Sequence, residues 1–176
     1  MNNELMFSSK NQAWDTPQNI YDALDDEFDF TLDPCCTTEN CKCPDGFYYD
    51  DGVDGLKAKW FGRVFMNPPY GREQYKWVRR ANDLWMRNNG LELVVGLLPA
   101  RTDTKLFHEF IWNTELSRAK ENIELHFLKG RITFGSEKYW RWVWEQEYIE
   151  GKKNKLYKKY GKKNPAPFPS MVVIWK

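Results

Sequence analysis

Residues 91–98, Leu-Glu-Leu-Val-Val-Gly-Leu-Leu, are almost entirely apolar and end at Pro99. Such a strand must be covered on both faces. This is typical of a central parallel strand and differs from an antiparallel strand that has one solvent-exposed face. A membrane span needs about 20 apolar residues, so the run is too short for one. It therefore predicts a sheet that carries helices on both sides.

Helix and strand patterns alternate around this run. Thr16-Pro17 predicts a helix start, with Thr16 as the cap and Pro17 in the first helical position. Further helices are expected over residues 72–88 and 104–112. Strands are expected over residues 28–32, 63–66, 91–98, 123–128, 131–134 and 171–175, the pair 123–128 and 131–134 being joined near Lys129-Gly130. This order predicts the α/β class and one domain, residues 1–176.

Unusual residues follow three of the expected strands. They are Asp33-Pro34-Cys35-Cys36, Asn67-Pro68-Pro69-Tyr70 and residues 99–103. In open α/β sheets, ligands bind outside the carboxyl ends of the strands. We therefore expect the three segments to lie along one rim and to form a single site.

The segment Asn67-Pro68-Pro69-Tyr70 has a specific chemical meaning. The Asn67 side chain and the Pro68 carbonyl are two acceptors, and the double proline restricts how they can move. Two converging acceptors suit an exocyclic amine with two N–H donors, and Tyr70 offers a ring on which a base can stack. Acceptors that draw on the amine hydrogens favour a pyramidal nitrogen with an available lone pair.

The same segments resemble those of the phage-type (Dam-like) DNA N6-adenine methyltransferases. The resemblance rests on 14–17, 27–35, 39–43, 67–70, 98–104, 130–134 and 167–171, and it leaves out about 137–164. It implies an abbreviated Rossmann-like S-adenosylmethionine-dependent methyltransferase fold, with a mixed sheet flanked by helices. It also implies methyl transfer from S-adenosyl-L-methionine to a flipped-out adenine in double-stranded DNA.

The resemblance also assigns roles to individual residues. Asn67, Pro68, Pro69 and Tyr70 are expected to be catalytic and to hold the adenine amine and ring. The residues expected to bind the cofactor are Trp14, Thr16, Pro17, Asp33, Pro34, Cys35, Asn40 and Asp54. Asp50 and Asp51 compete with Asp54 for its role. One departure is the absence of a glycine-rich turn after Asp33, since no glycine occurs before Gly46.

Charge is distributed unevenly along the chain. Residues 1–60 carry a net charge of −9 and residues 61–176 a net charge of +10, which suggests a basic face for a polyanion. Residues 152–163 hold seven lysines and no acid. The region 137–164 is thus a basic and aromatic insertion or loop that is expected to contact DNA, unless it is only a solvated loop. The expected DNA-binding residues are Arg101, Arg131, Lys152, Lys153, Lys155, Lys158 and Lys159.

The four cysteines, Cys35, Cys36, Cys41 and Cys43, lie close together in the sequence. A secreted disulfide scaffold would spread them out, so we expect reduced thiols and a cytoplasmic protein, in the host cell if the chain is phage-encoded. Their spacing matches no standard zinc pair, and no metal is expected. No membrane partner is expected either, and a homodimer is left open.

Other functions remain compatible with the sequence. The segment Asn67–Tyr70 also suits a methyltransferase that acts on RNA or on a protein glutamine. A non-catalytic nucleic-acid-binding protein that descends from a methyltransferase is a third reading, because the glycine turn is missing. The lysines and the extent of the resemblance favour DNA methylation.

Overall fold

The computed structural model describes residues 15–87, 90–135 and 166–176. Trp14, the region 137–164 and its five lysines named above therefore lie outside the described residues. Within the described part, no helix is both long and apolar enough to cross a membrane.

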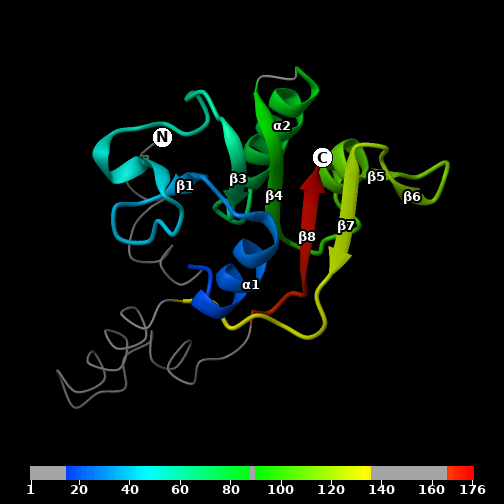
Figure 1. Cartoon of the computed structure of the whole chain (residues 1–176). Helices are drawn as coiled ribbons and strands as arrows, with labels where there is room; N and C mark the ends of the chain where they lie inside the picture. Colours follow the sequence, from blue (N-terminus) through cyan, green and yellow to red (C-terminus); the bar gives the residue numbers. More distant parts are fainter. Residues whose placement is uncertain (1–14, 88–89, 136–165) are drawn as a thin grey trace, which may run out of the picture.

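A six-stranded sheet forms the centre of the molecule (Figure 1), in the order β2-β1-β3-β4-β8-β7. Strands β1, β2, β3 and β4 are parallel, and β8 runs antiparallel between β4 and β7. The strands are β1 (Leu32–Cys36), β2 (Asp45–Tyr48), β3 (Gly62–Met66), β4 (Leu91–Pro99), β7 (Ile123–Phe127) and β8 (Ser170–Trp175). The expected mixed α/β sheet is confirmed.

Helices cover both faces of the sheet, as the apolar run in β4 predicts. Helix α1 (Gln18–Phe28) packs on one face, where Phe65 and Val95 point toward it. Helix α2 (Gln74–Met86) and the short π-helix η4 (Phe107–Ile111) pack on the other, against Val64 and Val94. Alternate residues of each central strand thus enter opposite cores, which explains why these strands are apolar throughout.

The expected first strand and first helix need correction. Phe28 ends α1, Asp29 adopts a left-handed conformation with φ 49°, and the strand begins only at Leu32. Pro34 therefore lies inside β1, at a register irregularity where a missing N–H is tolerated. Pro17, not Thr16, occupies the N-cap position of α1.

The expected helix over residues 104–112 is confirmed for 105–111, of which Phe107–Ile111 form the π-helix η4. The expected strand over residues 131–134 is wrong. Residues 131–134 form no strand; they follow Gly130, whose φ is +80°, and bury Ile132 and Phe134 against the α1 face. Three strands were not anticipated: β2 and the hairpin of β5 (Trp112–Asn113) and β6 (Arg118–Ala119). These strands have only two to four residues each, so they carry little periodic signal.

Candidate active site

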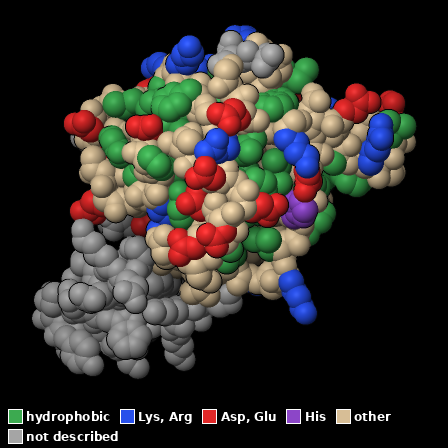
Figure 2. Space-filling model, viewed as in Figure 1, with side chains coloured by type: hydrophobic (Ala, Val, Ile, Leu, Met, Phe, Trp, Pro, Cys, Tyr) green, Lys and Arg blue, Asp and Glu red, His purple; other side chains and the backbone are tan. Residues whose placement is uncertain are grey.

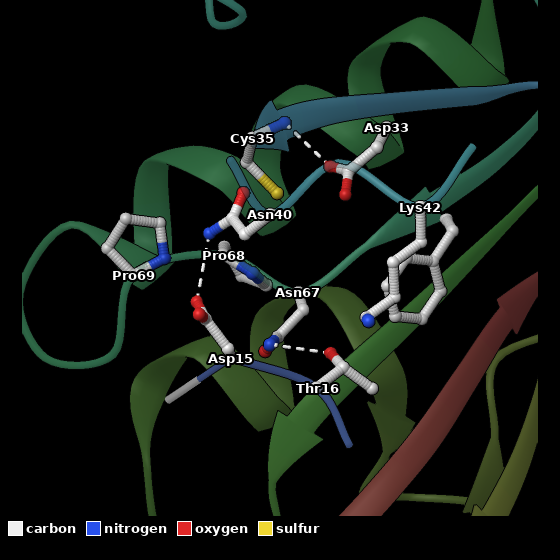
Figure 3. Close-up of a pocket in the computed structure, with 10 residues that line it drawn as sticks. Asp15, Thr16, Asp33, Cys35, Asn40, Lys42, Asn67, Pro68 and Pro69 are labelled. Carbon is white, nitrogen blue, oxygen red and sulfur yellow. Dashed lines mark hydrogen bonds between the residues drawn. The ribbon is translucent and has the colours of Figure 1, made fainter. Parts of the chain in front are cut away.

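The carboxyl ends of β1 and β3 meet at one cavity, as the strand order predicts. Asp33 and Cys35 reach it from β1, and Asn67, Pro68 and Pro69 reach it from the segment after β3. Figure 3 shows Asn67 between Asp33 on one side and the segment that precedes α1 on the other. Two of the three expected rim segments thus line one cavity.

The Asn67 side chain has a defined orientation. Its Nδ2 donates a hydrogen bond of 2.9 Å to Thr16 Oγ1, and Thr16 itself is buried. An amide accepts only through its oxygen, so Oδ1 is the Asn67 atom suited to an amine, and the bond to Thr16 fixes the direction in which the amide points. The same bond explains why Thr16 does not cap α1: its hydroxyl serves Asn67 instead of a backbone N–H of the helix.

Two carboxylates face this cavity, those of Asp15 and Asp33. Burial raises the pKa of each to about 6, against the effect of hydrogen bonds from Asn40 to Asp15 and from the Cys35 N–H to Asp33. Lys42 also lines the cavity and lowers both pKa values. A raised carboxyl pKa means that the ionised form lacks compensation, so a bound cation would stabilise it.

A second cavity lies on the other side of β1. Cys35 lines both cavities, and Pro34, Asp54, Phe47 and Tyr49 line only the second. Asp54 is exposed and accepts the Leu56 N–H at 3.0 Å. Asp54 is therefore separated from Asn67, and it faces a partly aromatic space.

Tyr70 lies beside the first cavity in an aromatic cluster. Its ring is nearly perpendicular to those of Phe134 and Phe168, at centroid distances of 5.7 and 5.4 Å. Arg101, just beyond the end of β4, places its guanidinium carbon 5.7 Å from the centre of the Phe168 ring. The third rim segment thus reaches the site through Phe168.

Pro17 and Arg131 lie together, outside the cavity that Asn67 lines. They line a groove with Lys129 between the start of α1 and the segment after β7. Pro17 is therefore not part of the cavity that holds Thr16 and Asp33, although it was expected to bind the cofactor with them.

The cysteines form no disulfide among the described residues. Within the same part of the chain, one group of donors is compact enough for an ion: Asp33, Cys36 and Cys41, whose ligand atoms lie within 4.8 Å of one another. That is one ligand fewer than a structural zinc site uses, and Asp33 is shared with the first cavity. We assign no metal to this group.

Sequence reasoning missed Asp15 and Lys42. Asp15 directly precedes Thr16, and Lys42 lies in the loop between β1 and β2, near the expected Asn40. Their charges were available in the sequence, but nothing in the pattern indicated that the chain turns them toward β3. Strand β2, which was not predicted, pairs with β1 and thereby keeps the loop that carries Lys42 close to the rim.

The mixed sheet with helices on both faces is consistent with a Rossmann-like methyltransferase fold. A comparison with protein-family models supports a narrower assignment: the family described as DNA N-6-adenine-methyltransferase (Dam) matches residues 5–176. The chain belongs to this family, and it is an S-adenosylmethionine-dependent DNA adenine-N6 methyltransferase. A comparison with curated proteins found no match.

Proposed function

We propose that Asn67 Oδ1 and the Pro68 carbonyl hold the N6 amine of the target adenine, and that Tyr70 contacts its ring. The observation that carries this proposal is the hydrogen bond from Asn67 Nδ2 to Thr16, because it fixes the orientation of an amide group that lines the cavity. Pro69 fixes the preceding carbonyl, since proline restricts the residue before it. The target adenine leaves the duplex to reach this rim, so double-stranded DNA is the proposed form of the substrate.

The chemistry of the first cavity fits the cofactor. S-adenosylmethionine supplies a methyl group on a positively charged sulfur, and its amino-acid end carries an ammonium and a carboxylate. Asp15 and Asp33 suit the positive groups, and Lys42 suits the carboxylate. Phe47 and Tyr49 of the second cavity suit the adenine of the cofactor, with Asp54 at its edge. Cys35 and Pro34 of β1 would lie between the amino-acid end and the adenine end of the cofactor.

The chain's residues position and polarise the nucleophile, with no acid or base required for attack. Asn67 Oδ1 and the Pro68 carbonyl accept the two amine hydrogens and make the nitrogen lone pair available. With S-adenosylmethionine bound, the amine nitrogen would take its methyl group, the electron pair of the broken carbon–sulfur bond would stay on sulfur, and the extra proton would pass from the nitrogen to water. Burial raises the pKa of the Cys35 thiol well above its usual value, so Cys35 stays neutral beside this reaction.

The path of DNA is constrained by surface charge. Figure 2 shows acidic side chains gathered over the part of this face where Figure 1 places α1. Asp22, Asp26 and Glu27 of α1 are exposed, so the outer face of this helix repels a phosphate backbone. Arg101 and Arg131, which are both exposed and follow β4 and β7, are the described cations that we propose to contact phosphates. The lysines of 137–164 and a homodimer remain predictions.

Replacing Thr16 by valine tests the orientation of Asn67. Valine has nearly the same shape but cannot accept the Asn67 hydrogen bond, so the amide loses the contact that directs its nitrogen at residue 16. We expect kcat for DNA methylation to fall about tenfold, the effect of one lost hydrogen bond, while Thr16→Ser keeps most activity. If Thr16→Val instead weakened cofactor binding and left kcat at saturating cofactor unchanged, Thr16 would serve the cofactor alone.

The affinity for S-adenosylmethionine should depend on pH. Asp15 and Asp33 each have a pKa near 6, so both are largely protonated at pH 5 and ionised at pH 7. A cationic ligand favours the ionised forms, so its Kd should fall between pH 5 and pH 7 by about tenfold for each carboxylate that contacts it. Calorimetric titrations measure this, and Asp33→Asn should remove one of the two contributions. A Kd that is constant over this range would contradict the assignment of these carboxylates to the cofactor.

A further inference from the structure

The aromatic cluster beside Tyr70 is not uniform in its exposure. Phe134 is buried, with 2% of its surface exposed, whereas Tyr70 and Phe168 are both partly exposed. Phe134 therefore packs against the cluster on its buried side. Tyr70 and Phe168 form a corner of two nearly perpendicular rings, with an interplanar angle of 82°, at the rim of the sheet.

Backbone pairing fixes the position of Phe168. The Ala100 N–H donates to the Pro169 carbonyl at 2.9 Å, and Pro99 of β4 pairs with Ser170 of β8. Phe168 is thus attached to the end of β4 and to the start of β8 at the same point. Prolines 167 and 169 on either side of it reduce its backbone freedom further.

Arg101 covers Phe168 from the solvent side. Its guanidinium lies 5.7 Å from the ring centre, within the range of a cation–π contact, and Arg101 is exposed. Because this contact is with a ring and not with a carboxylate, the N–H donors of the exposed guanidinium can still reach a phosphate.

We propose that Phe168 is the second wall of the pocket for the target adenine, and that Arg101 binds the DNA phosphate next to that adenine while it holds the Phe168 ring in place. This inference rests on the function proposed above for Asn67 and Tyr70. An adenine parallel to the Tyr70 ring meets Phe168 edge to face, which is a favoured aromatic arrangement. Phosphate binding and base binding are thereby joined through one contact.

The surroundings of Phe168 fit this role better than a purely structural one. Phe168 packs against the core on the α1 side, as other partly buried rings do, but it also lies between Tyr70 and Arg101 at the rim, which a purely structural role does not require. Aromatic contacts of this kind are the usual means by which proteins hold an unstacked base.

The test compares Phe168→Ala, Phe168→Tyr and Arg101→Gln in steady-state methylation of plasmid DNA with labelled S-adenosylmethionine. Phe168→Ala should raise the KM for DNA about tenfold without changing the Kd of the cofactor, and Phe168→Tyr should restore it. Arg101→Gln should raise the same KM and reduce its dependence on salt. The double variant should raise the KM for DNA by less than the product of the two single increases, because the two residues share one contact.

Matched controls separate this role from general damage. Phe61→Ala removes a ring that is 41% exposed just before β3, at the opposite end of the sheet, and Arg118→Gln removes an exposed arginine in β6. Neither should change the KM for DNA.

A second readout follows the base itself. After the methylated adenines are located by sequencing, 2-aminopurine at that position in a duplex should become fluorescent on binding the wild-type protein, and less so with Phe168→Ala. If Asn67→Ala is inactive but Phe168→Ala behaves as wild type in both assays, this inference is wrong and the function proposed above stands. If Phe168→Ala weakens the cofactor as much as the DNA, Phe168 is a structural residue and the inference is also wrong. If Asn67→Ala retains full activity, the proposed function itself fails.

Discussion

Asn67→Ala is expected to lower the rate of DNA methylation by about 100- to 1,000-fold, the usual cost of removing one preorganised polar group that acts on the reacting atom. The Asn67 side chain ends at the cavity that also holds Asp33, and its nitrogen is already bonded to Thr16. Alanine removes the acceptor but leaves Asp15, Asp33 and Lys42 in place. The Kd of S-adenosylmethionine, measured by calorimetry, should therefore change little.

Two further variants show whether the acceptor itself is what matters. Asn67→Asp retains an oxygen of the same shape, and the Thr16 hydroxyl can turn its hydrogen toward it, so this variant should keep more activity than Asn67→Ala. Asn122→Ala removes an exposed asparagine whose Nδ2 contacts Met86, and it should behave as the wild type. A large loss of cofactor binding in Asn67→Ala would show that Asn67 is a scaffold residue.

Gly55→Ala is expected to disrupt the site by a steric route. A Cβ on Gly55 would lie 1.8 Å from the Pro34 carbonyl oxygen and 2.9 Å from the Trp77 ring. The Gly55 carbonyl also accepts the Trp60 indole N–H at 2.7 Å, and Trp60 stacks on Trp77. Because the first clash is with backbone, the strand or the loop must move. We expect a loss of more than about 3 kcal/mol in the free energy of unfolding, above the usual cost of overpacking.

Gly52→Ala is the matched control in the same loop. No atom lies within 4 Å of a Cβ built on Gly52, but its φ of +83° is unfavourable for alanine. A cost of about 1 kcal/mol is expected from the backbone alone. Urea denaturation of the two variants measures the difference. Equal stabilities would mean that the contact between residue 55 and Pro34 is not a tight one.

The location of the site could be predicted from the sequence because it depends on strand direction alone. Asp33 and Asn67 each lie at the carboxyl end of an apolar segment, and parallel strands bring such ends to one rim. Helix α2 and strand β4 could equally be predicted from the sequence, since apolar periodicity is the strongest signal in a single sequence. The Arg63–Met66 expectation differed from β3 by a single residue.

The parts that could not be predicted depend on tertiary contacts of polar residues. Thr16 looked like a helix cap because its side chain can serve a backbone N–H, and only the folded chain shows that Asn67 uses it instead. Pro34 looked like the end of a strand, but a register irregularity accommodates it within β1. Asp15 and Lys42 carry no periodic pattern, so nothing local places them at the cavity.

The most direct test of the account is the nucleoside composition of plasmid DNA after incubation with S-adenosylmethionine and the purified chain. Mass spectrometry of the digested DNA should find N6-methyladenine with the wild-type protein and almost none with Asn67→Ala, although both proteins bind the cofactor equally. N6-methyladenine at the same level with both proteins would contradict the central claim that the acceptors at the end of β3 hold the reacting amine.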